Sequence, residues 1–525
     1  MNSRTLTLGL LMSLAAILAL IMGQWVATSP TYAIGGSVAV IAIAVILSLG
    51  RHLWLLLPLF VGFTGPMPFF PGGFAPREVI VICVFPILLG QWIIRRFPIR
   101  PSFGKIEWGL LIFLLLVLQA YVRNPVGLSL FGSDRVGGRP YFEVGIGLLA
   151  YLILSCQVVS QSLAKQAAAL CFSGYMILAV METAAGVVPG VAYFLAPLYA
   201  TSAGGLMLSA AGTYVDPTYH VGRVMYLKAY TEPLFGWLLA SRSPLQLLNP
   251  FRIVYFSIAC FALICILLSG FRSAILWLAL MSIGAIIVRK RYSEIFVMGV
   301  LGSLMVAVLL MGQGQLFNLP APAQRALSFL PGDWDKVAAS DAEGSAEWRF
   351  EMWRQALGTD RYIHNKWIGD GFGFSAAELQ YQASLAETGL RPQELQEYYL
   401  MVGNYHSGPV ETVRRVGYIG LAIFLVGVFI CSSYSFKLLR KSIGTLYEVP
   451  AFFLGLPLVI LPVTFIVGAG SLQTAIIQIC FLGGLLRVIE NSMNIVPVES
   501  EFPAKNTAES VTVRSPRQRR PLVTS

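Results

Sequence analysis

His406 is the residue of this chain that is best placed for acid–base chemistry. It stands in the segment NYHSGPVETV, directly before a helix that would run over 409–436. Proline favours the first turn of a helix, so His406 is expected beside a helix N-terminus at the membrane–water boundary. A neutral imidazole in that position can take a proton from a hydroxyl group. A capping or packing role is the alternative for His406.

Three acidic residues between 313 and 411 are candidates to orient His406 or to bind a metal ion. Glu411 is a candidate to orient the ring of His406, although an acid in a first helical turn commonly serves only the helix dipole. Asp333 and Asp335 form a DxD pattern, which is a weak signal inside an acidic segment. We therefore expect neither a metal ion nor an organic cofactor.

Arginines expected on the outer side of a membrane are the second chemical feature. Arg272 lies in SGFRSA at the end of an apolar run, Arg223 precedes another such run, and Arg349 lies in a polar segment. The planar guanidinium fork suits phosphate oxygens, so these residues are candidates to hold a phosphorylated lipid headgroup. The alternatives are snorkelling for Arg272 and an ordinary loop cation for Arg223. For Arg349 the alternative is a salt bridge with Glu347 or Glu351.

Residues 313–411 are a polar island that carries 13 of the 26 acidic residues of the chain. Within it, the apolar spacing over 345–358 predicts an amphipathic helix. The segment HNKWIGDGFGF follows, and its glycines Gly369, Gly371 and Gly373 allow a tight loop and close backbone approach. A large aqueous segment between membrane spans indicates chemistry at the membrane surface.

The elements that must position these residues are membrane helices. Mean hydropathy is +0.71 and only 12% of the residues are charged. An apolar run of about 20 residues crosses a bilayer as a helix. Such runs occur at 5–23, 31–49, 78–94, 107–122, 141–160, 166–188, 251–270, 272–288, 294–312, 416–436, 449–468 and 472–489, with weaker candidates at 52–64 and 231–248. The runs are continuous rather than alternating, which excludes a β-barrel. We expect an all-α polytopic bundle of about 12–14 transmembrane helices with one large periplasmic loop that contains short helices.

The formal net charge of +11 orients the helices and does not indicate a nucleic-acid partner. The cations gather at helix ends, in 95–105, 289–291 and 437–441. Because positive loops stay in the cytoplasm, both termini are expected inside and 313–411 outside. This arrangement requires 231–248 to span the membrane.

The sequence therefore divides into four parts. Residues 1–312 are an N-terminal transmembrane bundle, 313–411 a periplasmic catalytic loop, 412–490 the C-terminal transmembrane helices and 491–525 a disordered basic cytoplasmic tail. The first apolar run is interpreted as an anchor and not as a cleaved signal peptide. The seven cysteines lie in or beside apolar runs and are expected to be small core residues.

Three blocks in 200–435 together resemble the O-antigen ligase and O-antigen polymerase superfamily of membrane glycan transferases. They are SGFRSA with Arg272, then WRFEMWRQAL and KWIGDGFGF with Arg349, then YHSGPVETVRRVGYIGL with His406. Ser407 stands where the family pattern has Asn. The resemblance implies transfer of a saccharide from undecaprenyl pyrophosphate to an acceptor hydroxyl, at the periplasmic face of the bacterial inner membrane.

On this resemblance we expect a metal-independent, inverting glycosyltransferase for O-antigen or exopolysaccharide polymerisation or ligation. Arg272, Arg349 and Arg223 would bind the pyrophosphate, and His406 would activate the acceptor. The expected partners are a lipid-linked oligosaccharide donor, a glycan or lipid A-core acceptor, membrane lipids and a chain-length regulator. The acceptor stays open between polymerase, ligase and protein glycosylation, with polymerase favoured because no ligase-specific feature stands out.

Two other classes of protein fit parts of the pattern. A polysaccharide transporter or flippase would place ionisable residues at mid-membrane and often shows internal repeats. Here the polar residues gather in one outward segment, which disfavours transport. A sensor is also disfavoured, because 313–411 is short and tethered by helices at both ends.

Overall fold

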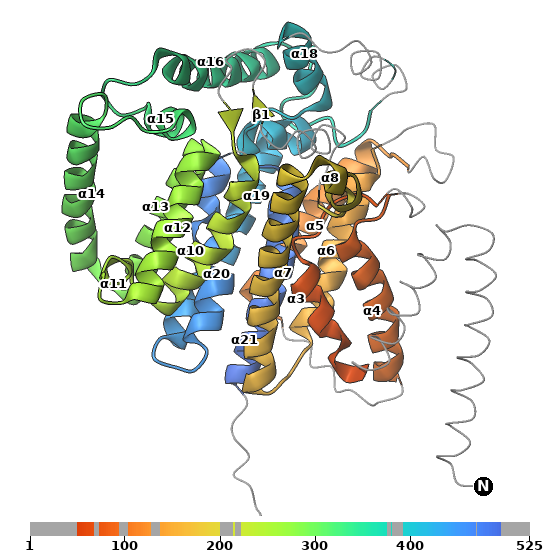
Figure 1. Cartoon of the computed structure of the whole chain (residues 1–525). Helices are drawn as coiled ribbons and strands as arrows, with labels where there is room; N and C mark the ends of the chain where they lie inside the picture. The colour runs from red at the N-terminus through yellow and green to blue at the C-terminus, as the bar shows by residue number, and fades with distance from the viewer. Residues whose placement is uncertain are drawn as a thin grey trace, which may run out of the picture.

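A computed structural model describes residues 50–67, 73–93, 103–127, 137–199, 214–215, 222–374, 380, 392–468 and 470–494. Over these ranges the chain is an all-α helix bundle with one pair of two-residue strands, as Figure 1 shows. Seven of the described helices are long and apolar enough to cross a membrane. The predicted fold class, a polytopic membrane helix bundle, is confirmed. The candidate spans 5–23 and 31–49, His220 and the tail beyond 494 lie outside the described residues.

The first half of the chain builds one side of the bundle. Its elements are η1 (Gly50–Leu55), α3 (Leu56–Phe60), α4 (Pro76–Ile93), α5 (Lys105–Arg123), α6 (Arg139–Ser155), α7 (Gln161–Val187), α8 (Pro189–Leu195) and η3 (Ala196–Leu198). The weak candidate 52–64 is a 3₁₀ turn followed by five α-helical residues, which is too short to cross a membrane by itself.

The middle of the chain supplies the strands and the next group of helices. Its elements are β1 (Tyr214–Val215), β2 (Gly222–Arg223), η4 (Met225–Leu227), α10 (Lys228–Ser241), α11 (Pro244–Leu247), α12 (Ile253–Ser269), α13 (Arg272–Arg289) and α14 (Tyr292–Gly312). The weak candidate 231–248 is α10 followed by the single turn α11. Pro244 starts that turn after an extended break at Arg242 and Ser243.

The last part of the chain forms a cap over one end of the bundle and then returns to its centre. Its elements are α15 (Ala321–Leu327), α16 (Lys336–Gly358), α18 (Pro392–Val402), α19 (Gly408–Ser442), α20 (Glu448–Val467) and α21 (Leu472–Met493). The predicted amphipathic helix is present, but it begins at Lys336 because Asp335 caps it there. The cap of α15, α16 and α18 lies at the top of Figure 1.

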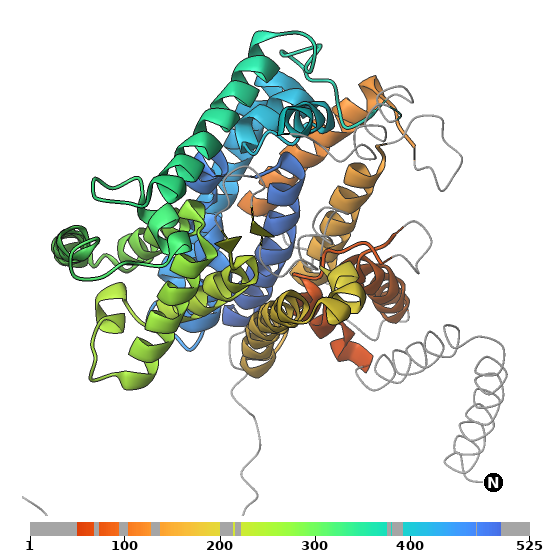
Figure 2. The ribbon, with the colours of Figure 1, turned by 45° about the horizontal axis from the view of Figure 1, so that its top comes forward.

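The core of the bundle is built around its last helices. In α20 and α21, 67% and 83% of the apolar 18-residue stretch that could span a membrane is buried inside the protein. In the sequence both helices look like ordinary membrane spans. Their contacts are with α5, α6, α7, α10, α13 and α19. Glycines allow the neighbouring pair α5 and α19 to approach, since a Cβ on Gly427 would lie 2.5 Å from Phe113. Figure 2 shows α20 and α21 enclosed by the other helices.

Helix α14 is the opposite case. Only 6% of the apolar stretch of α14 is buried, and this helix stands apart from the bundle in Figures 1 and 2. Its exposed apolar side chains occur all round the helix: Ile295, Phe296, Val297, Val300, Leu301, Leu304, Met305 and Val308. A helix that is apolar on every side is stable inside protein or lipid and not in water.

The two ends of the bundle differ in charge. Arg289 and Arg291 close α13 and open α14, and Arg440 and Lys441 close α19, all at the end away from the cap. Arg289 pairs with Glu448 at 3.1 Å and donates to the carbonyl oxygens that end α10. The cation-rich connections and the polar island therefore lie at opposite ends of the bundle, as the sequence predicts.

Candidate active site

Asp341 is a fully buried acid that holds two arginines from other segments. Arg223 of β2 donates from Nη2 to both carboxylate oxygens, at 3.2 and 3.3 Å. Arg325 of α15 donates from Nε to the same carboxylate, and its Nη1 donates to the carbonyl oxygen of Gly270 at 2.7 Å. Because a buried charge must be paired, Asp341 ties β2, α15 and α16 together.

Arg272 reaches this group from a membrane-spanning helix. Gly270 ends α12 in the left-handed conformation (φ 69°), which glycine adopts at no steric cost, and α13 begins two residues later at Arg272. The Nη2 atom of Arg272 donates to the carbonyl oxygen of Ala342, next to Asp341. The SGFRSA segment thus brings Arg272 to the same place as Arg223.

Arg349 lies on α16, two turns after Asp341. Its side chain is accessible, yet desolvation by nearby protein atoms and then the charges of Arg272 and Arg223 lower its pKa. No hydrogen bond or ion pair to Arg349 is found in the described part of the chain. Glu351, one of the two partners considered for Arg349, pairs with Arg354 instead, at 2.9 Å.

These four arginines around one acid form what we call the arginine cluster: Arg223, Arg272, Arg325 and Arg349 around Asp341. Of the four, Arg223 and Arg325 pair with the carboxylate of Asp341, and the four guanidinium groups together exceed its charge by a formal +3. Desolvation and the charge of Arg223 also lower the pKa of Arg325. Like charges held this close favour an anion between them, and the guanidinium forks suit phosphate oxygens.

His406 lies beside the same helix α16, between two aromatic rings. The ring of Trp348 lies 5.7 Å from the imidazole and that of Tyr399 lies 5.2 Å away, between centroids. Trp353 donates from Nε1 to the carbonyl oxygen of Tyr405 at 2.7 Å, which fixes the loop that carries His406. His406 has φ 50°, a backbone conformation that is uncommon for residues other than glycine.

His406 is electrostatically coupled to the arginine cluster. Burial, and then the positive charge of Arg349, lower the pKa of His406 to about 4. The imidazole is therefore neutral at pH 7, and one of its ring nitrogens is free of a proton. A neutral imidazole beside a cationic group can accept a proton from a hydroxyl while the arginines hold an anion.

The start of α19 sets the position of His406. Ser407 caps this helix, because its Oγ accepts from the backbone N–H of Val410 at 3.5 Å. Ser and Asn are both good helix caps, so Ser407 can replace the Asn of the family pattern in this structural role. Glu411 lies 3.9 Å from Arg415, and no contact joins Glu411 to His406 among the described residues. An orienting role for Glu411 stays a prediction.

Helix α19 is interrupted at Gly417, where φ is 75° and ψ is −179°. The segment 366–371 lies against this kink and takes up the backbone groups that the helix leaves free. Four backbone hydrogen bonds join them: Asp370 N to Arg414 O (2.7 Å), Gly371 N to Arg415 O (3.0 Å), Tyr418 N to Lys366 O (2.8 Å) and Ile419 N to Trp367 O (3.2 Å). The second and third sequence blocks are therefore one unit in space.

Glycines and an arginine make this close approach possible. Gly369 has φ 75°, and a Cβ on it would lie 2.4 Å from the backbone nitrogen of Val416. Arg123, at the end of α5, donates to the carbonyl oxygens of Ile368 and Gly369. The close backbone approach predicted for Gly369 is present, and its partner is the kink of α19.

Sequence reasoning missed three arginines of this region. Arg325 completes the arginine cluster, and the signal for it was a further arginine inside the polar island. Arg414 donates to the carbonyl oxygens of Leu400 and Met401, which fixes the end of α18. Arg415 is buried beside Glu411, and its Nε and Nη1 have no hydrogen-bond partner among the described residues. Two adjacent arginines at the outward start of a span were the signal for Arg414 and Arg415.

The DxD pattern has a structural use. The carboxylate of Asp335 accepts from the backbone N–H groups of Val337 and Ala338, at 2.9 and 3.0 Å. Asp335 is thus the N-cap of α16, the helix that carries Asp341 and Arg349. No group of three His, Cys, Asp or Glu side chains within reach of one metal ion is found in the described ranges.

A comparison with known families covers much of this region. Residues 257–425 match the family model described as O-Antigen ligase. This range includes Arg272, Arg325, Arg349 and His406, whereas Arg223 lies before it. The chain therefore carries an O-antigen ligase domain, and the O-antigen ligase and polymerase superfamily predicted from the three sequence blocks is confirmed. No curated protein matches the sequence.

Proposed function

We propose that this protein transfers a saccharide from an undecaprenyl-pyrophosphate carrier to an acceptor hydroxyl at the periplasmic face of the inner membrane. The observation that carries the proposal is the arginine cluster, in which four arginines surround one buried acid at the outer end of α13. The O-antigen ligase domain supports glycan transfer of this general type.

The arginine cluster would bind the pyrophosphate of the donor. A pyrophosphate offers several charged oxygens, which match the excess of +3 in the arginine cluster. When the sugar C1–O bond breaks, negative charge grows on the departing pyrophosphate, and the arginines stabilise it. Positive charge from arginine then does the work that a divalent metal does in other transferases.

His406 would act as the base. The acceptor oxygen forms a bond to C1 of the sugar, the bond from C1 to the pyrophosphate breaks, and the hydroxyl proton passes to the imidazole. Attack from the side opposite to the pyrophosphate inverts the anomeric centre. The bound pyrophosphate also offsets the charge of Arg349, which otherwise lowers the pKa of His406, so the base becomes stronger when the donor is present.

The orientation of the protein follows from the charge of its ends. Because positive loops stay in the cytoplasm, the cation-rich ends of α13 and α19 would lie there, the cap and the site would face the periplasm, and both termini would be inside. A cysteine at Ser340, in the cap helix α16, is then expected to react with an impermeant thiol reagent in intact spheroplasts. Labelling that appears only after lysis would contradict this orientation.

A transporter is the second candidate function, and the packing of the bundle weighs against it. A transport path needs a polar route that runs from one end of the bundle to the other, whereas buried apolar side chains of α20 and α21 fill the end away from the cap. The acceptor is a growing glycan, lipid A-core or a protein, and the proposal does not choose among them. A chain-length regulator is a further proposed partner.

Transfer by the purified protein tests the proposal. The protein in proteoliposomes is given lipid-linked oligosaccharide and acceptor glycan, with EDTA present. We expect a longer or newly attached glycan and release of undecaprenyl pyrophosphate. Flipping of the donor without any transfer would favour the transporter. Transfer that stops in EDTA and returns with magnesium would contradict metal independence.

A further inference from the structure

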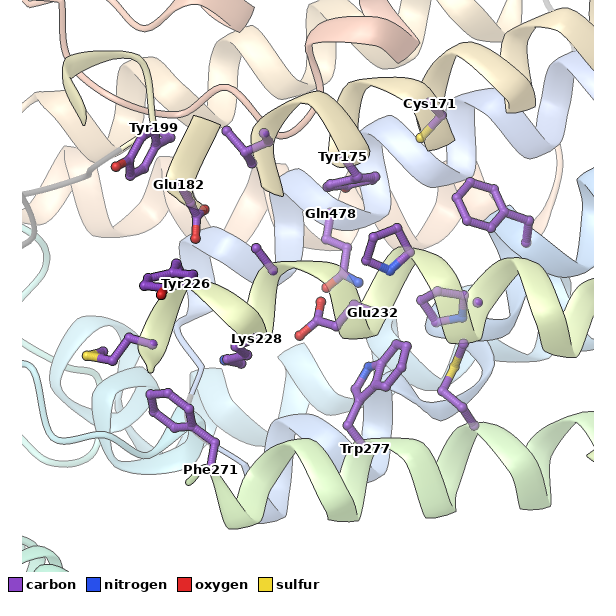
Figure 3. A pocket seen from close by; sticks show the side chains of 18 of the residues that line it. Cys171, Tyr175, Glu182, Tyr199, Tyr226, Lys228, Glu232, Phe271, Trp277 and Gln478 are labelled. Atoms are coloured by element: carbon purple, nitrogen blue, oxygen red, sulfur yellow. The ribbon is translucent and has the colours of Figure 1, made fainter. Parts of the chain in front are cut away.

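A cavity of about 530 Å³ lies inside the bundle, next to the arginine cluster. It is bounded by α7, α10, α13, α20 and α21, and Figure 3 shows its lining. Tyr226 and Phe271 stand at its outer end, and Phe271 directly precedes Arg272 of the arginine cluster. Cys171, Met281 and Phe453 form its deeper, apolar part. The cavity therefore leads from the arginine cluster into the membrane-spanning part.

Three charged side chains line the outer half of this cavity. Glu182 comes from α7, and Lys228 and Glu232 come from successive turns of α10 (Figure 3). Neither carboxylate has a hydrogen bond or ion pair with another described residue, and Lys228 lies over the ring of Phe271 at 5.1 Å. Two acids and one base give this space a formal charge of −1. Ionisable groups at this depth are costly and mark a functional site by default.

The other polar and aromatic groups of the lining suit a sugar. Tyr175 and Tyr226 offer hydroxyl groups, Gln478 offers an amide, and Trp277 offers a broad ring face. Sugar hydroxyls donate hydrogen bonds to carboxylates, and such charge-assisted bonds are the stronger ones. The volume lies within the range of small-ligand sites, roughly 300–1,000 Å³.

A polyprenyl chain and a pyrophosphate, the two parts of the proposed carrier, fit the cavity less well than a sugar does. A polyprenyl chain would bury Glu182 and Glu232 against hydrocarbon without hydrogen bonds, which is costly. A pyrophosphate would meet two carboxylates in the cavity, whereas the arginine cluster outside it is strongly cationic. The charges therefore favour pyrophosphate at the arginine cluster and an uncharged sugar in the cavity.

We propose that this cavity is the binding site for the acceptor saccharide, with Glu182 and Glu232 accepting hydrogen bonds from its hydroxyl groups. The proposal rests on the proposed transferase function and adds a separate place for its second substrate. The donor pyrophosphate occupies the arginine cluster, and the acceptor approaches it from the cavity past Phe271. Glu182 and Glu232 are positioning residues here, because they bind the acceptor and do not take part in bond breaking.

Kinetics of conservative variants test this assignment. Glu232→Gln and Glu182→Gln keep the shape of the side chain and remove its charge. The KM for the acceptor is expected to rise about tenfold or more in each variant, since a hydrogen bond to a charged group is lost. The KM for the donor and the binding of inorganic pyrophosphate are expected to stay within about twofold. Asp360→Asn, the same exchange at an exposed residue of the cap, is the control and should change neither KM.

Protection of a cysteine gives a second measurement that does not depend on turnover. Ala229 lines the cavity, so Ala229→Cys in nanodiscs should react with a small methanethiosulfonate, read by mass spectrometry of that peptide. Phosphate-free oligosaccharides prepared from the finished polysaccharide should slow this reaction, and undecaprenyl pyrophosphate should not. Protection by undecaprenyl pyrophosphate, or by neither compound, would overturn the acceptor site. Absence of any transfer by the unaltered protein would instead contradict the transferase function itself.

Discussion

The carbonyl oxygen of Trp367 lies only 2.1 Å from the position that a Cβ on Gly417 would occupy. Trp367 belongs to the cap segment and Gly417 to the kink of α19, so the two polypeptide segments touch through their backbones. A side chain at Gly417 would force them apart. Through this contact the loop with its three glycines is held against the helix that follows His406.

The first prediction concerns this contact. Gly417→Ala places a methyl group against Trp367 and asks alanine to adopt φ 75°. A strained backbone of this kind costs about 1–3 kcal/mol before the steric overlap is counted. We expect a clear drop in the midpoint of thermal unfolding and loss of transfer. Gly302→Ala, in α14, meets no atom within 4 Å and serves as the control. Equal midpoints for the two variants would contradict the role of the kink.

The second prediction concerns the buried acid of the arginine cluster. Asp341→Asn leaves Arg223 and Arg325 without their counter-charge. Loss of one partner from a buried ion pair typically costs about 3–5 kcal/mol, so the variant should unfold at a much lower temperature. Inorganic pyrophosphate should restore part of this stability, because an anion can replace the carboxylate. Thermal unfolding with and without pyrophosphate measures both effects, and a variant insensitive to pyrophosphate would count against the anion site.

The third prediction compares the loss of Arg349 with the loss of Arg354, another arginine of α16. Arg349→Ala removes an arginine of the cluster that has no ion pair in the described ranges, so the protein should fold normally and bind pyrophosphate more weakly. Transfer should fall about ten- to a hundredfold, as expected for a lost contact to a charged group. Arg354→Ala, five residues later and paired only with exposed Glu351, should transfer normally. Arg272→Lys should also be impaired, because lysine lacks the planar fork. Unchanged transfer in folded Arg349→Ala would reject its role.

The fourth prediction concerns His406 as the base. A general base typically contributes about a hundred- to ten-thousandfold to the rate. His406→Ala should therefore abolish transfer while the lipid-linked donor still binds. His364→Ala is the matched control, because His364 is exposed and lies 3.3 Å from Asp370. Product glycan and accumulated donor are compared at equal expression. Wild-type product from His406→Ala would show that the proton goes elsewhere.

The fifth prediction is a pH dependence. The pKa of His406 is lowered from 6.5 to about 4 in the folded protein. Between these values the unfolded chain binds a proton that the folded chain does not, so the contribution of His406 to stability is present above pH 6.5 and is lost as the pH falls toward 4. The unfolding midpoint of the wild type, relative to that of His406→Gln, should therefore fall as the pH decreases from 8 to 4. A constant difference from pH 8 to pH 4 would contradict the lowered pKa.

The membrane helices were predictable because each is a continuous apolar run, and composition alone reports that. Helices α5, α13 and α20 appear within two residues of their predicted spans, whereas α19 extends beyond its span at both ends. The burial of α21 and the isolation of α14 were not predictable, since both runs are apolar enough to be interpreted as membrane spans and the difference lies in their packing. The helix over 345–358 was expected, but its start at Lys336 depends on the capping carboxylate of Asp335.

The site was predictable where a residue type is unusual for its place in the membrane. Arg272, Arg349 and Arg223 stood out because arginines are unusual on the side that is expected to face outward, and the structure brings them together. Arg325 did not stand out among polar neighbours, and its role depends on a contact with Asp341 sixteen residues away. The acids of the cavity, Glu182 and Glu232, lie within apolar runs that were interpreted only as spans.

The isolation of α14 should make its sequence more tolerant of substitution during evolution than the sequences of the packed helices. Since its apolar side chains touch almost nothing within the described protein, packing places few demands on their identity. Length and hydropathy remain as the requirements, because α14 must still carry the chain from α13 to the cap. Substitutions among Leu, Val, Ile, Phe and Met should accumulate there more freely than in α20 or α21. A foreign membrane helix of equal length, spliced in between Tyr292 and Gly312, should leave the arginine cluster intact.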